Sequence, residues 1–348
     1  MYAKVETYFG SAPEGWDSTV AQFGGPVFHS TVWARYQKET RKVQPLFLLL
    51  RDQDGEVCAG TAAFFRQSQR PIASLIFRDL VLPSHPFVRD KNGTVAAYFM
   101  DKCEEVGQEL GCARLRLESF MGGSSPFVPA SHGYTETCRM EFSLDLSRNI
   151  DSLWQGMRKD QREKIKRLKR EGIIVEVGGE RADIVGLRSV REATQEKRTQ
   201  RGQGYELSAD DEFYDGLYEH LVQRGAARLF VAKYDNQVIA ALFFAAFGGQ
   251  AYSIFSGSSD FGYKLGAQSG LFWTAVETFK SEGFQVLNRG GVPASAAEET
   301  DPLHGIYLFK LRLGTTPVVC RSGEKVLSLV RNSLVKLRDR WRELKESH

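Results

Sequence analysis

The chain has 348 residues and a mass of 39.1 kDa, which is too long for one ordinary compact domain and fits two of roughly 150–180 residues. Hydrophobic residues make up 42% and charged residues 26%, so the chain has enough apolar surface for two cores and is not mainly disordered. The formal net charge is only +3, but Lys and Arg outnumber acidic residues by eight to two in 158–170 and by seven to two in 325–345. Two basic elements in an otherwise acidic chain indicate anionic partners or substrates.

The sequence shows none of the usual signals of membrane insertion, secretion, disulfide frameworks or metal sites. No stretch approaches 18 uninterrupted apolar residues, and the N-terminal MYAKVETYFG has no basic patch followed by an apolar segment. The five cysteines form no CxxC pair, and the histidines have no ligand spacing relative to one another. We therefore expect a cytoplasmic protein with free thiols and no metal.

The first half is predicted to mix helices with apolar strands. Asp54-Gly55 supplies a hairpin turn between the first two strands, and Gly111 ends the second helix. The predicted elements, in chain order, are a helix within 27–39, strands at 46–51, 57–66 and 73–82, a helix at 94–110, and strands at 113–119 and 138–146.

The second half opens with a long basic helix over about 150–171, which Gly172 ends. The predicted elements that follow are a strand at 173–177, helices at 183–200 and 209–224, strands at 227–234, 237–247 and 250–256, a helix at 267–281, strands at 284–289, 306–311 and 316–320, and a C-terminal helix at 325–345.

Both halves show the same order: three consecutive strands, a helix, a glycine and a further strand. A meander that crosses by a helix to another strand is a mixed α/β layer structure. We therefore predict an α/β fold with mixed sheets, duplicated in tandem. The predicted domains are 1–147 and 148–324, followed by a basic amphipathic helix at 325–348.

Four segments carry a resemblance to a known family: FHSTVWARYQKE, LWQGMRKDQREKIKRLKREGIIVEV, AYSIFSGSSDFGYKLGAQSGLFWTAVETFKSEGFQVLNRGG and GIYLFKLRLG. In this order and spacing they resemble the FemAB-like (peptidoglycan bridge-forming) aminoacyltransferases within the GCN5-related N-acetyltransferase (GNAT) superfamily. The resemblance spans most of residues 27–314 and implies tandem GNAT-like domains.

The resemblance implies transfer of an acyl group to an amine. The donor would be aminoacyl-tRNA or acyl-CoA, used as a co-substrate without a tightly bound cofactor, and the acceptor a cell-wall or polysaccharide precursor. No Ser/His/Asp or Cys/His constellation is recognisable, which favours direct attack without a covalent acyl-enzyme. The alternatives are an acetyl-CoA-dependent N-acetyltransferase of a small molecule or protein, and an inactive relative that binds nucleic acid or glycan.

Lys310 is the first catalytic candidate, because the resemblance places the Phe309-Lys310 pair near the aminoacyl end of the donor. Its ammonium would stabilise the oxyanion or hold a donor phosphate. In the predicted strand, Tyr307 and Phe309 share one face and Lys310 points to the other. Phe309 either packs in the core or stacks on a donor base. Asp301, in the preceding loop, is a candidate base or part of a solvated acidic loop.

Substrate contacts are expected at Trp33, Arg35 and Lys38 of the entry motif and at Phe255 and Tyr307. In the entry motif, Arg35 follows Trp33 at the place where the family binds acceptor phosphates, and Lys38 on the same helix is the fallback. The alternative is a helix-surface arginine. Phe255 stands where Fem members tend to have a tyrosine and is a further contact candidate, as is Tyr307 on the signature segment.

Donor phosphates have two candidate sites. Arg158, Arg162 and Lys166 share one face of the basic helix at i, i+4 spacing, which suits a phosphate backbone or a solvated face. Lys264, Gly266 and Ala267 loosely match a pyrophosphate turn before a helix, although glycines there also serve ordinary loop geometry.

The C-terminal helix places Val330, Leu334, Leu337, Trp341 and Leu344 on one stripe among several cations. Three interpretations are open: docking on the second domain, dimerisation, or peripheral contact of residues 325–345 with an anionic membrane. The sequence does not determine the oligomeric state.

Overall fold

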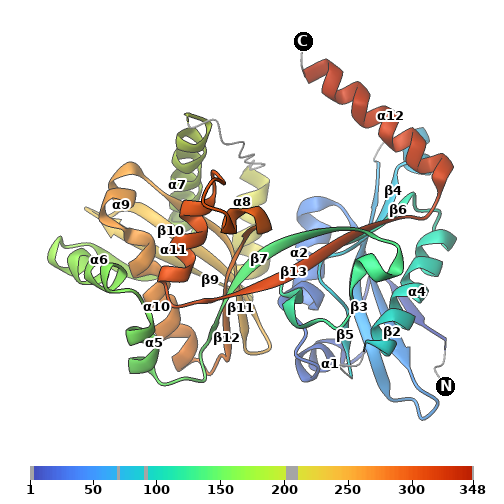
Figure 1. The fold of residues 1–348 in the computed structure, drawn as a ribbon, viewed down its shortest axis with the longest axis horizontal. Helices are drawn as coiled ribbons and strands as arrows, with labels where there is room; N and C mark the ends of the chain where they lie inside the picture. Colours follow the sequence, from blue (N-terminus) through green and yellow to red (C-terminus); the bar gives the residue numbers. More distant parts are fainter. Residues whose placement is uncertain (1–3, 69–70, 90–92, 201–210, 347–348) are drawn as a thin grey trace. The chain divides into compact units, whose positions relative to one another are not determined.

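The computed structural model describes residues 4–68, 71–89, 93–200 and 211–346. The chain packs as two compact units (Figure 1). Unit 1 comprises Met1–Arg139 and Cys320–His348, and unit 2 comprises Met140–Val319.

The chain leaves unit 1 within strand β7 (Thr135–Asp145) and returns to it within strand β13 (Thr316–Val326). The first division therefore lies a few residues before the predicted boundary at 147. The second division differs more, because residues 320–324 and the C-terminal helix group with unit 1 rather than following the second domain.

Unit 1 is built on a sheet with the strand order β1-β2-β3-β4-β6-β13, and β5 pairs with β3. Its core gathers apolar side chains of β2, β3, β4, β6 and α4. The elements are β1 (Glu6–Phe9), α1 (Trp16–Gln22), η1 (Val27–His29), α2 (Thr31–Arg41), β2 (Gln44–Arg51), β3 (Val57–Gln67), α3 (Pro71–Ile76), β4 (Arg78–Leu82), β5 (Phe87–Val88), α4 (Thr94–Glu109), β6 (Arg114–Leu117), η2 (Gly122–Ser124), η3 (Pro129–His132) and α12 (Leu329–Glu346).

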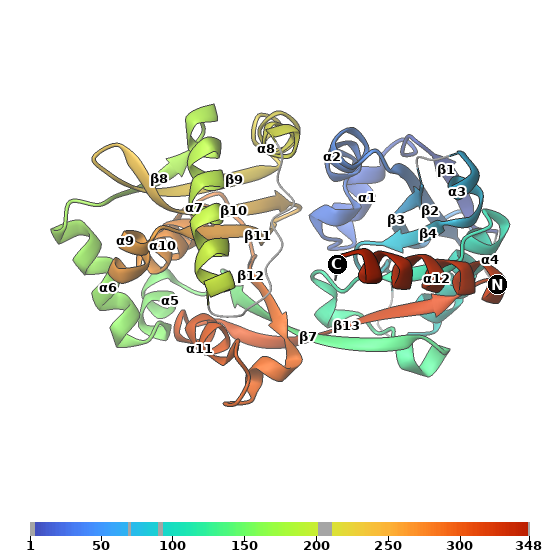
Figure 2. The ribbon, with the colours of Figure 1, turned by 90° about the horizontal axis from the view of Figure 1, so that it is seen from above.

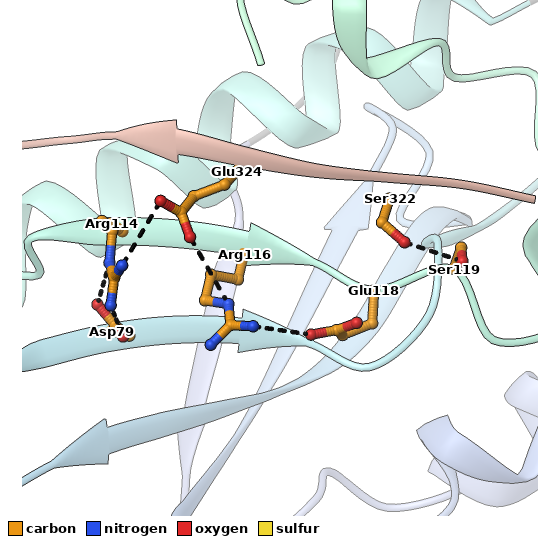
Figure 3. Close-up of polar contacts among 7 residues, drawn as sticks. All are labelled: Asp79, Arg114, Arg116, Glu118, Ser119, Ser322 and Glu324. Atoms are coloured by element: carbon orange, nitrogen blue, oxygen red, sulfur yellow. Dashed lines mark hydrogen bonds and ion pairs between the residues drawn. The ribbon is translucent and has the colours of Figure 1, made fainter. Parts of the chain in front are cut away.

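The C-terminal strand joins unit 1 through backbone pairing and polar side chains (Figure 3). β13 runs antiparallel to β6, with Glu324 opposite Arg116. The Glu324 carboxylate lies 3.6 Å from Arg114 and 3.8 Å from Arg116, and Ser322 Oγ donates to Ser119 Oγ at 2.9 Å. These contacts explain why the last residues belong to the first unit.

Unit 2 is built on a sheet with the order β7-β12-β11-β10-β9-β8. Its elements after β7 are α5 (Ile150–Gly156), α6 (Lys159–Arg170), β8 (Ile174–Gly178), α7 (Arg181–Gln200), α8 (Asp211–Leu217), the π-helical turn η4 (Tyr218–Val222), β9 (Ala227–Tyr234), β10 (Gln237–Phe247), β11 (Gln250–Ser258), α9 (Asp260–Leu265), α10 (Ala267–Ser281), β12 (Val286–Pro293), η5 (Ala294–Ala297) and α11 (His304–Arg312).

The predicted internal repeat is confirmed by strand order and direction. In unit 1, β2, β3 and β4 form an antiparallel meander, and α4 leads to β6, which is parallel to β4. In unit 2, β9, β10 and β11 form the same meander, and α9 and α10 lead to β12, which is parallel to β11. The predicted α/β class with mixed sheets is therefore correct.

Helices cover both faces of the unit 2 sheet (Figure 2). Ala240, Leu242, Phe244 and Ala246 of β10 pack in one cluster with α10, so they share a face. Phe243 points to the opposite face, where its ring lies 6.1 Å from Phe255 and where α7 packs on β10 and β11. The apolar run in β10 is thus explained by burial on both sides.

The predicted strand at 73–82 is wrong in its first half, because α3 occupies Pro71–Ile76 and β4 begins only at Arg78. The predicted helix at 150–171 is interrupted. Met157 and Arg158 are extended, with ψ near +140°, and the Arg158 amide donates to Arg312 O at 2.9 Å. The break buries Met157 in the unit 2 core.

Two more predicted elements differ in form. The helix predicted at 209–224 is α8 followed by η4, and its first two residues lie outside the described part of the chain. The strand predicted at 306–311 is the helix α11, which ends before Gly314 with its φ of +84°. A short apolar run such as IYLF fits a buried helix as well as a strand, which explains the error.

Candidate functional site

In unit 2, the parallel pairing of β11 and β12 stops partway along both strands. The pairing covers Gln250–Tyr252 against Val286–Asn288, although β11 continues to Ser258 and β12 to Pro293. It stops just before Gly290, whose φ of +72° is a conformation that other residues rarely adopt. The strands β11 and β12 are therefore paired where they begin and separate further along.

Arg289 places a buried guanidinium at this point. Its side chain is 5% exposed, and it donates to Ser253 Oγ at 3.0 Å and to Gln268 Oε1 at 2.9 Å. Both acceptors are neutral, and burial lowers the pKa of Arg289 to about 10. Among the described residues, its buried Nε finds no hydrogen-bond partner. Burying a cation among neutral groups is costly, which favours a role toward an anionic ligand group or transition state.

Gln268, in the first turn of α10, supports Arg289 from the helix side. Its Nε2 donates to Ala241 O at 3.0 Å and to Gly257 O at 2.8 Å. The side chain therefore bonds the backbone of β10 and of the separated part of β11. This fixes its Oε1 toward Arg289.

Lys310 reaches the same point from α11. It is 7% exposed, and its Nζ donates to Arg289 O at 3.0 Å and to Gly291 O at 3.2 Å. A Cβ at Gly290 would lie 2.9 Å from Ser253 O and 3.7 Å from Lys310 Nζ, so glycine alone fits between them. We call Ser253, Gln268, Arg289, Gly290 and Lys310 the splay network.

A buried polar cluster lies next to the splay network, at the last paired residues of β11 and β12. Glu141 of β7 accepts hydrogen bonds from the Tyr252 hydroxyl at 2.9 Å and from Asn288 Nδ2 at 2.8 Å. Asn288 Oδ1 in turn accepts from the Gly290 amide at 2.8 Å. Three strands are thereby tied together at the place where two of them separate.

The helical form of α11 changes the faces predicted for its residues. Tyr307 and Lys310 lie one turn apart on the same side, and both contact the Phe142 ring, at 5.4 Å in each case. Phe309 packs against the core of unit 2. The predicted opposition of Tyr307 and Lys310 is therefore wrong, while stacking of the partly buried Phe309 on a donor base stays a prediction.

Asp301 lies in the segment before α11, as predicted. Its carboxylate accepts from the Leu303 amide at 2.7 Å, and this hydrogen bond holds the pKa of Asp301 below its usual value. A lower pKa makes the carboxylate a weaker proton acceptor. Its role as a base stays a prediction.

Phe255 belongs to an aromatic cluster on the α7 face of the sheet. The Arg191 guanidinium lies 4.3 Å from its ring centre, and the Phe213 ring lies 5.4 Å away. Arg191 is itself buried and donates to the Tyr214 hydroxyl at 2.9 Å. A substrate contact of Phe255 stays a prediction.

The predicted phosphate-binding cations lie at and within α6. Arg158 is the residue before the helix and lies 3.3 Å from Asp160, while Arg162 donates to Gln155 Oε1 at 2.9 Å. Lys166 pairs with Glu163 at 3.1 Å. Because Arg158 precedes the helix, only Arg162 and Lys166 of the predicted face lie within α6.

The predicted pyrophosphate turn lies where α9 meets α10: Lys264 is in the last turn of α9, Gly266 joins the two helices and Ala267 begins α10. The amides of Gly262 and Gly266 donate to Ser259 Oγ at 3.1 Å and Tyr263 O at 3.0 Å. The Lys164 stem packs against Gly266, because a Cβ there would lie 2.6 Å from Lys164 Cδ. Lys264 is exposed and Ala267 buried at the start of α10. The Gly266 amide already has an acceptor, which makes it poorly suited to hold a pyrophosphate.

The three predicted acceptor-binding residues lie on α2 of unit 1. Ser30 caps this helix by accepting from the Trp33 amide at 3.3 Å, and the Trp33 ring is buried against Phe28. Arg35 and Lys38 are exposed on the same helix. Their binding roles stay predictions.

The splay network contains three side chains that the sequence did not indicate as site residues, Ser253, Gln268 and Arg289. A signal for Arg289 was present, since it is a lone cation that follows an apolar strand and precedes Gly290-Gly291. Gln268 gave no comparable signal, because its importance comes from the backbone oxygens it bonds.

The chain resembles known proteins in one sequence segment and in its whole fold. Residues 155–299 match the family model described as an acetyltransferase (GNAT) domain. The crystal structure of FemX is 15% identical with a TM-score of 0.73, covering 95% of this chain and 99% of that one. L-PGS from Bacillus licheniformis is 15% identical with a TM-score of 0.55, covering 94% and 96%. The C-terminal domain (DUF2156) of a putative lysylphosphatidylglycerol synthetase from Agrobacterium fabrum is 14% identical with a TM-score of 0.51, covering 82% and 84%.

No curated protein matches the sequence. Residues 155–299 match an acetyltransferase (GNAT) domain, which supports an acyltransferase, and the chain as a whole has the duplicated fold of FemX. This similarity of fold along nearly the whole chain agrees with the FemAB-like resemblance.

Proposed function

We propose that the protein transfers an acyl group, with an aminoacyl group as the leading candidate, to an amine of a cell-envelope precursor or polysaccharide. The splay network is the proposed site. The observation that carries the proposal is the buried Lys310 ammonium, which is held by Arg289 O and Gly291 O where β11 and β12 separate. A fixed cation in a poorly solvated position is suited to stabilise an oxyanion.

The reaction would proceed by direct attack. The acceptor nitrogen bonds the carbonyl carbon of the donor, and the carbonyl oxygen becomes an oxyanion beside Lys310 and Arg289. The bond to the donor oxygen or sulfur then breaks, and the leaving group takes the proton that the amine loses. Ser253 is not an activated nucleophile, since its Oγ accepts from Arg289, a cation that cannot remove its proton.

An aminoacyl-RNA donor is supported by α6, where Lys159, Lys166, Arg167, Lys169 and Arg170 are exposed. One structural relative is named a putative lysylphosphatidylglycerol synthetase, and its named product is an aminoacylated lipid. Acyl-CoA is the second candidate donor, because residues 155–299 match an acetyltransferase domain model. The Gly266 amide, directly before α10, already has an acceptor, which weighs against that candidate.

The test is transfer of a labelled acyl group from aminoacyl-tRNA or acetyl-CoA to amine acceptors, together with the melting-temperature shift that each donor causes. We expect transfer by the wild type from one donor and a large loss in Lys310→Met. Lys102→Met, on α4 of unit 1, is the matched control and should keep full activity. Transfer by Lys310→Met at the wild-type rate would refute the proposed site, and no transfer from either donor would refute the proposed function.

A further inference from the structure

The C-terminal helix α12 presents its apolar side outward. Asn332 and Val335 are buried, whereas Val330, Leu334 and Leu337 are 74%, 38% and 57% exposed. These three residues are spaced i, i+4 and i+7 and form one stripe along the helix. Within unit 1, the described part of this stripe is therefore exposed, and its docking on the second domain stays a prediction. The side chains of Trp341 and Leu344 lie outside the described residues.

One flank of α12 is anchored in unit 1. Arg331 donates to Gly111 O, and the Arg338 guanidinium lies 4.3 Å from the Phe77 ring centre. Leu327, just before the helix, packs against Gly107 of α4. These contacts fix the rotation of the helix about its axis. The outward position of the apolar stripe therefore follows from the attachment.

Cations flank the stripe on both sides. At 100° per residue, Arg331 and Arg338 lie on one flank, and Lys336 and Arg340 lie on the other, where both are exposed. Residues 325–345 carry seven Lys or Arg and two acidic residues. A second copy of this helix would bring the same positive charge opposite it, which disfavours self-association. An anionic lipid surface complements both the apolar stripe and the cations.

We propose that α12 is a membrane-docking surface that lies in the interface of an anionic bilayer, with Val330, Leu334 and Leu337 inserted among the lipids and Lys336 and Arg340 at the headgroups. In the described part of the chain, no helix is long and apolar enough to cross a membrane. The helix would therefore lie on the bilayer and hold unit 1 against it. This inference does not depend on the proposed acyl transfer.

The apolar arm of the test uses vesicles of phosphatidylcholine with and without phosphatidylglycerol, in a flotation assay with the full chain. Val330→Ser/Leu334→Ser/Leu337→Ser should lose about tenfold or more of its affinity for the anionic vesicles, because three apolar side chains no longer leave water. Ile174→Ser/Val177→Ser/Val185→Ser, which alters three exposed side chains of unit 2, is the matched control and should bind like the wild type.

The charge arm compares Lys336→Gln/Arg340→Gln with Lys4→Gln/Arg224→Gln, which removes two exposed cations elsewhere. Only the first pair should weaken binding to the anionic vesicles, and added salt should weaken wild-type binding. Failure of the wild type to float with anionic vesicles, or unchanged binding of the triple serine variant, would overturn the proposal. A dimer by light scattering that the triple serine variant abolishes, without vesicle binding, would assign the surface to a second copy instead.

Discussion

The two units use the same strand order and differ in how the crossing strands meet. In unit 1, Asp79–Leu82 of β4 pair in register with Arg114–Leu117 of β6, and hydrogen bonds extend the pairing beyond both ends of β6. In unit 2, the matching strands β11 and β12 pair over three residues and then separate. Strands that are paired along their length leave no free backbone hydrogen-bonding groups for a substrate, whereas separated strands expose such groups. The comparison therefore favours unit 2 as the location of acyl transfer.

The arginines at the two crossings also differ in their partners, which are carboxylates in unit 1 and neutral groups in unit 2. In unit 1, Arg114 bonds the Asp79 carboxylate at 2.9 Å, and Arg116 lies near Glu118 and Glu324 (Figure 3). In unit 2, Arg289 bonds a hydroxyl and an amide. A cation with a carboxylate partner is a stabilising element, whereas one with neutral partners can serve a ligand.

The largest expected effect is at Lys310. If its ammonium stabilises the oxyanion, Lys310→Met should lower turnover by about 10²–10³-fold, corresponding to about 2.7–4 kcal/mol of activation free energy. Steady-state kinetics checks this, with the melting temperature measured to confirm folding. A loss confined to KM would instead assign Lys310 to donor binding.

Unit 1 should lose stability in acid, because His29 is fully buried in it. Its Nδ1 accepts from the Ala62 amide at 3.2 Å, so the neutral ring donates from Nε2 to His85 O at 2.9 Å. Burial lowers the pKa of His29 from 6.5 to about 4. The unfolded chain thus binds this proton first as the pH falls, and unfolding free energy should drop by about 3 kcal/mol between pH 6.5 and 4.

The measurement is chemical unfolding at several pH values. The pH dependence in this range should be smaller in His29→Asn than in the wild type. An identical slope in His29→Asn would show that other groups cause the acid sensitivity.

Substitution of Arg114 should mainly lower stability, whereas substitution of Arg289 should mainly lower activity. Arg114→Met leaves the half-buried Asp79 carboxylate without its bidentate partner and should cost about 2 kcal/mol of unfolding free energy with transfer unchanged. Arg289→Met removes a cation that has neutral partners, so it should change stability by less than about 1 kcal/mol while reducing transfer. Denaturant unfolding and kinetics of both variants check this, and the reverse pattern would contradict the comparison.

The smallest effect on stability is expected at the basic helix of unit 2. Arg158→Gln/Arg162→Gln/Lys166→Gln should change unfolding free energy by no more than about 0.5 kcal/mol, since these side chains lie at the surface. If they contact phosphates, the slope of log affinity for RNA against log salt should fall by about two to three. RNA binding equal to that of the wild type would leave α6 as a solvated face.

Much of the fold could be predicted because its signals are local. The strands at 227–234, 237–247 and 250–256 and the helix at 267–281 were predicted nearly to the residue, since glycines and polar turns bound apolar runs of clear length. The predictions failed at 73–82 and 306–311, where short apolar runs fit either a strand or a helix. Tertiary packing decided between the two forms.

The sequence by itself determined the duplicated α/β order and the two basic helices, because these depend on periodicity and composition, and its resemblance to a known family made Lys310 a candidate. Only the tertiary structure decided three further points. It paired β13 with β6, so the last residues returned to unit 1. It brought Arg289, Gln268 and Lys310 together from three elements at the point where the pairing of β11 and β12 ends. It also turned the apolar stripe of α12 outward. Each of these depends on contacts between residues distant in the chain, and no local pattern contains that information.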